Sequence, residues 1–185
     1  KMDIFGVNVL GATTAVGGGI MRDIILGLTP PGAFSHPVYV LVAALTSTIL
    51  FVIAYAKPTA FESRVKTDYY DKLMFWCDTA GLGIFTVVGI QAAVRAVGGE
   101  NVFFFVFIGT LTGVGGGVLR DIMAGETPYI LVKHIYACAA IAGGIVCVVG
   151  RTAFGEAYGT ILGLAATVLL RFFGSSFQVE SDAVS

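Results

Sequence analysis

Long apolar runs separated by short polar connections dominate this chain. A membrane-spanning helix needs about 20 consecutive, mostly apolar residues. Six stretches meet that requirement: residues 4–28, 37–56, 73–97, 102–124, 130–150 and 154–174. The runs are continuous and do not alternate, which favours helices over the strands of a closed barrel, the other structure that spans membranes. The pattern therefore predicts an all-α integral membrane protein that crosses the bilayer several times.

The composition agrees with a protein that lies in lipid. Charged residues make up 12% and hydrophobic residues 56% of the 185 positions, whereas a soluble domain usually carries about 25% charged residues. Too little polar surface is left to face water, so we expect the lipid bilayer to surround the protein. The formal net charge of -1 gives no reason to expect nucleic acid as a partner.

One segment of the chain occurs twice. Residues 11–30 read GATTAVGGGIMRDIILGLTP and residues 109–128 read GTLTGVGGGVLRDIMAGETP, and twelve of the twenty aligned positions are identical. Each copy has three consecutive glycines followed, two residues later, by Arg-Asp. A spanning helix tolerates neither feature well, since glycine weakens the helix and charge is costly in lipid. We interpret the two copies as halves of one functional site.

The offset of 98 residues between the copies predicts how they are arranged. Two other spans lie between them, so the second copy enters the membrane from the opposite side. The copies are then antiparallel, as in the inverted repeats of many transport proteins. The span 73–97 precedes the second copy, and its counterpart would fall before Lys1. We therefore expect three plus three helices and a final seventh, with the first helix absent from this chain.

This arrangement divides the chain into five parts. They are a first repeat without its first helix (1–56), a cytoplasmic linker (57–72), a second, inverted repeat (73–150), a final helix (151–174) and a polar tail (175–185). Positive residues favour the cytoplasmic side. They cluster on the linker's side of the membrane, at Lys1, Lys57, Arg64, Lys66, Lys72, Lys133 and Arg171. We predict a cytoplasmic C-terminus.

Two glycine triplets lie near the middle of their spans: Gly17, Gly18 and Gly19, and Gly115, Gly116 and Gly117. Three glycines lower helix propensity by roughly 2–3 kcal/mol relative to alanine, and irregular backbone at membrane depth survives where it is buried or lines a wet cavity. We favour a kink that exposes main-chain carbonyls to a permeating solute, and the alternative is close helix packing. Glycines spaced by four residues predict packing faces, at Gly109, Gly113 and Gly117 and at Gly155, Gly159 and Gly163.

Ionisable residues inside a span indicate function by default, because charge there is costly. Arg22 and Asp23 are such residues, repeated as Arg120 and Asp121. Adjacent helical positions do not face each other, so we expect neither Arg-Asp pair to neutralise itself. Symmetry offers Arg22 with Asp121 and Arg120 with Asp23 as partners. The alternative is that each arginine extends to the interface and each aspartate has a helix-end role.

Three further polar residues are candidates for a cavity wall. Asp78 lies within its span and could face the cavity or partner an arginine. Thr14 and Thr112 precede the triplets by one turn, where a hydroxyl could face solute or bond its own backbone. The glycines fit no phosphate- or dinucleotide-binding motif, and no Ser-His-Asp or Cys-His set is credible. We expect no enzyme, no cofactor and no metal site.

The repeated T-x-V-G-G-G-x-x-R-D-I motif, the sequence DTAGLGIFTVVG beginning at Asp78 and the three-plus-three-plus-one layout resemble a known family. They are similar to the prokaryotic members of the trimeric intracellular cation channel family, a broad family that also contains bacterial proteins labelled glycine transporters. The resemblance covers roughly residues 4–174. It implies a homotrimer in the prokaryotic plasma (inner) membrane, with a separate pore for potassium and sodium in each subunit.

The resemblance also assigns roles to residues of this chain. It implies that the helices 4–28 and 102–124 are kinked at the glycine triplets and line the pore. The family's polar motif matches Arg22, Asp23, Arg120 and Asp121. The basic pore motif of the eukaryotic members has no clear match here, so their gating is not carried over.

Two functions are compatible with these features. The leading hypothesis is a passive monovalent-cation channel, in which carbonyls replace part of the ion's hydration shell and the acids favour cations. The alternative is a small-solute secondary transporter of the glycine type, in which Arg22 or Arg120 binds a carboxylate. A third possibility is a scaffold whose glycines only pack. Alanine at Gly18 or Gly116 should leave a scaffold stable but change the conductance of a channel.

Overall fold

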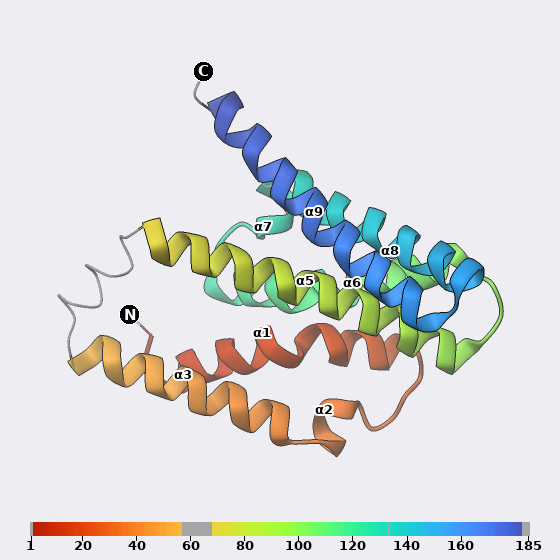
Figure 1. The fold of residues 1–185 in the computed structure, drawn as a ribbon. Helices are drawn as coiled ribbons and strands as arrows, with labels where there is room; N and C mark the ends of the chain where they lie inside the picture. The colour runs from red at the N-terminus through yellow and green to blue at the C-terminus, as the bar shows by residue number, and fades with distance from the viewer. Residues whose placement is uncertain (1, 57–67, 133, 183–185) are drawn as a thin grey trace.

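The fold is a bundle of long helices (Figure 1). The computed structural model describes residues 2–56, 68–132 and 134–182, and all regular secondary structure in these stretches is helical. The long helices are α1 (Ile4–Ile25), α3 (Val38–Ala56), α5 (Asp68–Val97), α6 (Val102–Ala124), α8 (His134–Phe154) and α9 (Glu156–Asp182). Six helices in the described part of the chain are long and apolar enough to cross a membrane. The predicted all-α membrane fold is therefore confirmed.

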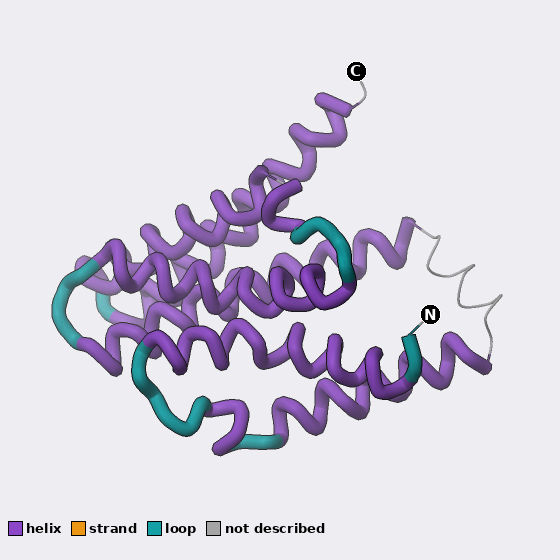
Figure 2. The backbone as a smooth tube through the Cα atoms, turned by 180° about the vertical axis from the view of Figure 1, so that it is seen from behind, coloured by secondary structure: helices purple, strands orange, loops and turns teal. Residues whose placement is uncertain are grey.

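Helix α6 lies at the centre of the bundle. It packs against α1, α5 and α8, while α3 covers α1 and α9 covers α8. Figures 1 and 2 show α1 and α3 as one layer, α5 and α6 in the middle, and α8 and α9 on the other side. The N-terminus, α7 (Tyr129–Val132) and the C-terminal end of α9 lie at one end of the bundle, and α2 (Gly32–Ser35) lies at the opposite end.

The helix ends follow from local sequence. The side chain of Asp3 accepts a hydrogen bond from Gly6 N at 2.8 Å and caps α1, and Asn101 caps α6 in the same way. Gly125 ends α6 with φ of 75°, a left-handed conformation that costs glycine little. These caps satisfy main-chain groups that the helix ends would otherwise leave without partners.

Several predicted boundaries and one connection need correction. The span expected at 130–150 is divided into the short helix α7 and the longer α8, which continues to Phe154. Helix α8 ends there because Gly155 adopts φ of 96°, and α9 begins only at Glu156. The connection after α1 contains the four-residue helix α2, which hydropathy does not reveal. Helix α5 already begins at Asp68, inside the expected linker.

Some sequence-based predictions fall on residues that the structure does not describe. Among the positive residues used for orientation, Lys1, Lys57, Arg64, Lys66 and Lys133 lie outside the described residues. The cytoplasmic C-terminus and the division into repeats therefore stay predictions.

Close helix contacts hold the bundle together. Lipid tails are as apolar as leucine, so helices in a membrane associate largely through tight packing of small residues. An added Cβ at Gly109 would lie 2.7 Å from the carbonyl oxygen of Thr86, which shows how closely α6 approaches α5. At Gly159 it would lie 2.5 Å from Arg151 N on α8. The predicted packing role of Gly109 and Gly159 is confirmed, and the last helix packs within the subunit.

Candidate pore site

The two glycine triplets meet where α1 and α6 cross. A Cβ at Gly18 would collide with the carbonyl oxygen of Thr112, and a Cβ at Gly116 would collide with the carbonyl oxygen of Thr14. The two contacts are reciprocal, and each joins a glycine of one copy to the threonine of the other. The helices run antiparallel at this point (Figure 1), with Gly17 against Leu119 and Met21 against Gly115.

Both helices continue through the triplets without a break. Helix α1 runs unbroken from Ile4 to Ile25 and α6 from Val102 to Ala124. The expected kink at the triplets stays a prediction, since a continuous helix can still bend. The neighbouring helix covers the carbonyl oxygens of Thr14 and Thr112. Tight packing lets glycine stay helical despite its poor propensity.

Alanine at Gly18 or Gly116 does not separate a scaffold from a channel. Either methyl group would meet backbone, which cannot rotate away, so packing would suffer in both cases. Alanine at Gly18 or Gly116 is therefore not a valid test, and substitutions at glycines outside the helix contact are needed instead.

The last glycine of each triplet faces open space instead. A Cβ at Gly19 would meet only the guanidinium of Arg22 at 3.9 Å, and one at Gly117 would meet only that of Arg120 at 3.8 Å. Each triplet thus has its first two glycines in the helix contact and its last glycine beside a cavity. The prediction that Gly117 belongs to the packing face is wrong, because it lines a cavity wall.

The threonines bond their own helices. Thr14 Oγ1 donates to the carbonyl of Leu10 and Thr112 Oγ1 to that of Ile108, both at 2.7 Å. Of the two roles that the sequence left open, this is the backbone role. Both residues still line the cavity described below.

Each arginine of the duplicated motif pairs with the aspartate that follows it. Arg22 Nη2 lies 2.7 Å from Asp23 Oδ1, and Arg120 Nη2 lies 2.8 Å from Asp121 Oδ1. In both pairs Nε also donates to the same oxygen at 2.8 Å. The expectation that neither pair neutralises itself is wrong. The spacing rule concerns the directions of the Cβ atoms, and an arginine is long and flexible enough to turn back.

The alternative pairing of Arg22 with Asp121 does not occur because the helices are antiparallel. From the crossing at Gly18 and Gly116, the helices carry these two residues in opposite directions. At 1.5 Å per residue they are separated by roughly 13 Å along the helix axis. One Arg-Asp pair therefore lies toward each end of the bundle.

The aspartates also fix the short helices that follow. Asp23 Oδ2 accepts from Gly32 N at the start of α2, and Asp121 Oδ2 accepts from Tyr129 N at the start of α7, both at 2.8 Å. Each carboxylate thus links an arginine to a connecting segment. Asp23 is buried, with only 3% of its surface exposed, and its two partners explain how a charge persists there.

A first cavity, the glycine cavity, lies between α1, α5 and α6 and has a volume of about 190 Å³. Backbone and small side chains form much of its wall. Its lining includes Thr14, Gly18, Gly19, Asp78, Gly81, Thr112, Gly116, Gly117 and Arg120. The structure therefore brings together most of the residues that the sequence singled out, with polar groups from both copies of the motif.

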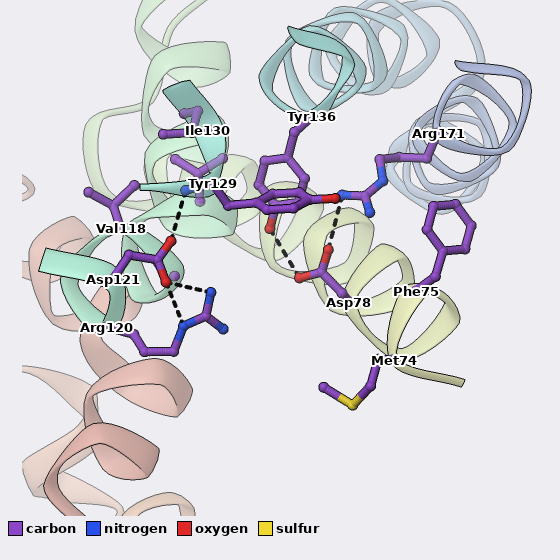
Figure 3. Close-up of a pocket in the computed structure, with 12 residues that line it drawn as sticks. Met74, Phe75, Asp78, Val118, Arg120, Asp121, Tyr129, Ile130, Tyr136 and Arg171 are labelled. Carbon is purple, nitrogen blue, oxygen red and sulfur yellow. Dashed lines mark hydrogen bonds and ion pairs between the residues drawn. The ribbon is translucent and has the colours of Figure 1, made fainter. Parts of the chain in front are cut away.

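A second cavity, the tyrosine cavity, lies between α5, α6, α7, α8 and α9 and has a volume of about 280 Å³ (Figure 3). The two cavities share four lining residues: Asp78, Gly117, Arg120 and Tyr136. They are therefore adjacent. Asp121 lines the tyrosine cavity, whereas Arg22 and Asp23 belong to the opposite end of the bundle.

Asp78 has two partners in the tyrosine cavity. Its Oδ2 lies 3.0 Å from Arg171 Nη1, and its Oδ1 accepts from Tyr136 Oη at 3.3 Å. The sequence offered an arginine as a partner of Asp78 but identified neither Arg171 nor Tyr136. Arg171 counted only as a positive residue for orientation, although it lies inside the predicted last span, where a charge indicates function. The aromatic Tyr136 carried no signal that separates it from a packing residue.

Known proteins are similar to this chain over most of its length. A family model described as "Glycine transporter" matches residues 1–55 and 75–152. The chain belongs to this family. The UPF0126 inner membrane protein YadS of Escherichia coli is 37% identical over 173 residues, which cover 92% of this chain and 78% of YadS. The membrane protein YvgT of Bacillus subtilis is 31% identical over 178 residues, covering 96% of this chain and 82% of YvgT.

The chain is also similar to solved cation channels. A TRIC cation channel superimposes with a TM-score of 0.81 at 32% identity, covering 96% of this chain and 82% of the channel. A trimeric TRIC orthologue from Rhodobacter sphaeroides gives a TM-score of 0.74 at 29% identity and 95% coverage of both chains. The resemblance to the trimeric intracellular cation channels is confirmed, and this family member is a multi-pass membrane protein.

Proposed function

We propose that this protein is a monovalent-cation channel for potassium and sodium, with a pore inside each subunit of a homotrimer. The observation that carries the proposal is the glycine cavity, in which both copies of the duplicated motif meet. Its polar lining is a wall that a partly dehydrated cation could pass. The likeness to TRIC cation channels supports the same function.

The pairing of charges in the cavities removes an objection to this proposal. Arginines in a wall repel cations, but Arg120 is paired with Asp121, and Arg171 is paired with Asp78. The four charges that line the tyrosine cavity sum to zero. A cation therefore meets dipoles and compensated pairs.

We extend the proposal to the arrangement in the membrane. The reciprocal contacts of Gly18 and Gly116 support inverted repeats with the pore near their common axis. We place the protein in the prokaryotic inner membrane, as the name of YadS states for that relative, and its C-terminus in the cytoplasm. Many large apolar side chains on α3 are exposed, including Leu41, Leu45 and Ile49, as expected where a helix faces lipid or a neighbouring subunit.

Potassium flux into proteoliposomes tests the proposal. Purified protein should carry a flux that empty vesicles lack, and a side chain at Gly117 should reduce it. Gly117 lines both cavities, and a Cβ there meets no backbone. Flux should therefore fall from the wild type to Gly117→Ala to Gly117→Leu, while the unfolding temperature of Gly117→Ala does not fall. Equal fluxes in the three proteins would place the ion path elsewhere.

Glycine transport is the second candidate. The family model bears that description, and the tyrosine cavity presents guanidinium and carboxylate groups together, which suits a zwitterion. Saturable uptake of labelled glycine by the same vesicles would support it. Unitary ionic currents without glycine would argue for the channel.

A further inference from the structure

Arg171 on α9 is a charge buried at the edge of the proposed pore. Only 5% of its surface is exposed. The guanidinium carbon lies 4.5 Å from the ring centroid of Tyr136 and 5.1 Å from that of Phe75. Its Nη1 is 3.0 Å from Asp78 Oδ2, yet Nη1 makes no well-directed hydrogen bond. Figure 3 shows the guanidinium and the carboxylate facing each other in the tyrosine cavity.

This placement is costly if packing is its only purpose. A buried arginine loses its hydration, and one ion pair with two aromatic faces compensates only part of that loss. An apolar side chain of similar size would fill the same space between Phe75 and Tyr136 without a charge. The charge of Arg171, and not its size, therefore distinguishes it from an apolar residue at this position.

The partner of Arg171, Asp78, is accessible from both cavities. It lines both cavities, and 42% of its side chain is exposed. Asp121, the other acid of the tyrosine cavity, is occupied by Arg120 and by Tyr129 N. The Asp121 side chain is only 13% exposed and lines one cavity, so Asp78 is the more accessible acid for a cation in either cavity, with Arg171 as the positive group at its side.

We propose that Arg171 is a specificity-determining residue: it compensates the charge of Asp78 where the two cavities meet, and so sets how strongly the pore favours cations over anions. This inference rests on the proposed channel function. The last helix would then contribute to selectivity, although the duplicated motif lies on α1 and α6.

The size of the effect follows from the distance. A cation bound beside Asp78 would lie about 4 Å from the Arg171 charge, where the repulsion lowers its occupancy about fivefold even at the dielectric constant of water. An anion is attracted to the Arg171 charge instead. Removal of this charge therefore favours potassium and disfavours chloride, and both effects raise the ratio of potassium to chloride permeability.

Reversal potentials in a potassium chloride gradient test the inference. Arg171→Gln should raise the ratio of potassium to chloride permeability about fivefold, and Asp78→Asn should lower it. The double variant Asp78→Asn/Arg171→Gln should return to the wild-type ratio, and Arg171→Lys should keep it. Arg95→Gln is the matched control, because it removes the same charge from an exposed pair with Glu156, 72% and 46% exposed.

The outcomes separate the inference from the proposed function. If the wild type conducts but the reversal potential of Arg171→Gln equals that of Arg95→Gln, the inference is overturned. If Arg171→Gln does not fold, Asp78→Asn decides: an unchanged ratio overturns the inference and a lowered ratio supports it. Absence of current from the folded wild type would overturn the channel proposal and this inference with it.

Discussion

Alanine substitutions within one glycine triplet should have opposite effects on stability. Gly18 and Gly19 are neighbours in sequence, in the same helix, and each would gain one methyl group. The methyl group at Gly18 would collide with the carbonyl oxygen of Thr112, whereas at Gly19 the nearest atom is the flexible tip of Arg22 at 3.9 Å. Only the first substitution forces two helices apart.

The expected magnitudes follow from two terms. Alanine gains about 1 kcal/mol of helix propensity over glycine at either position. Overpacking costs about 1–3 kcal/mol, and it applies to Gly18→Ala alone. We therefore expect Gly19→Ala to be up to about 1 kcal/mol more stable than the wild type, and Gly18→Ala to be less stable by as much as about 2 kcal/mol.

Denaturation in mixed micelles measures this difference. Trp76 is the single tryptophan, so its fluorescence reports unfolding of one site on α5 during a titration with dodecyl sulfate. Gly116→Ala and Gly117→Ala form a second, independent pair on α6 with the same expected order. If Gly18→Ala unfolded at the same or a higher denaturant fraction than Gly19→Ala, the close crossing of α1 and α6 would be refuted.

Two further substitutions test other parts of the fold. Gly163→Ala would place its methyl group 2.9 Å from the carbonyl oxygen of Gly143. With the same gain in helix propensity, we expect a net loss of up to about 2 kcal/mol in the same titration, whereas Gly81→Ala, with nothing within 4 Å, should lose nothing. Asp121→Ala leaves Tyr129 N without its acceptor at 2.8 Å. We expect a loss of about 1–3 kcal/mol and faster proteolysis near α7, and an unchanged cleavage rate would contradict the role assigned to the carboxylate.

Much of the fold could be predicted because lipid restricts the choices. A spanning segment must satisfy its backbone internally, so continuous apolar runs gave the six long helices. The glycines at 109 and 159 were correctly expected at helix contacts, since small residues permit close approach. Boundaries near Gly125 and Gly155 depend on single left-handed residues, and hydropathy averages over such local features.

The candidate site was predictable in its membership but not in its contacts. The repeat identified Gly19, Gly117 and Arg120, which line the glycine cavity. It gave no side-chain conformations, so the ion pair of Arg120 with its own neighbour Asp121 was excluded on the direction of Cβ alone. Arg171 was missed because its partner Asp78 lies on a helix far away in sequence, and one sequence does not reveal that contact.

Single-channel recording of the purified protein in lipid bilayers shows directly whether the protein conducts potassium along the glycine cavity. In a potassium chloride gradient, we expect unitary currents whose reversal potential is shifted from zero toward the potassium equilibrium potential, and smaller currents in Gly117→Leu. Absence of such currents, together with saturable uptake of labelled glycine by the same preparation, would contradict the proposed channel function.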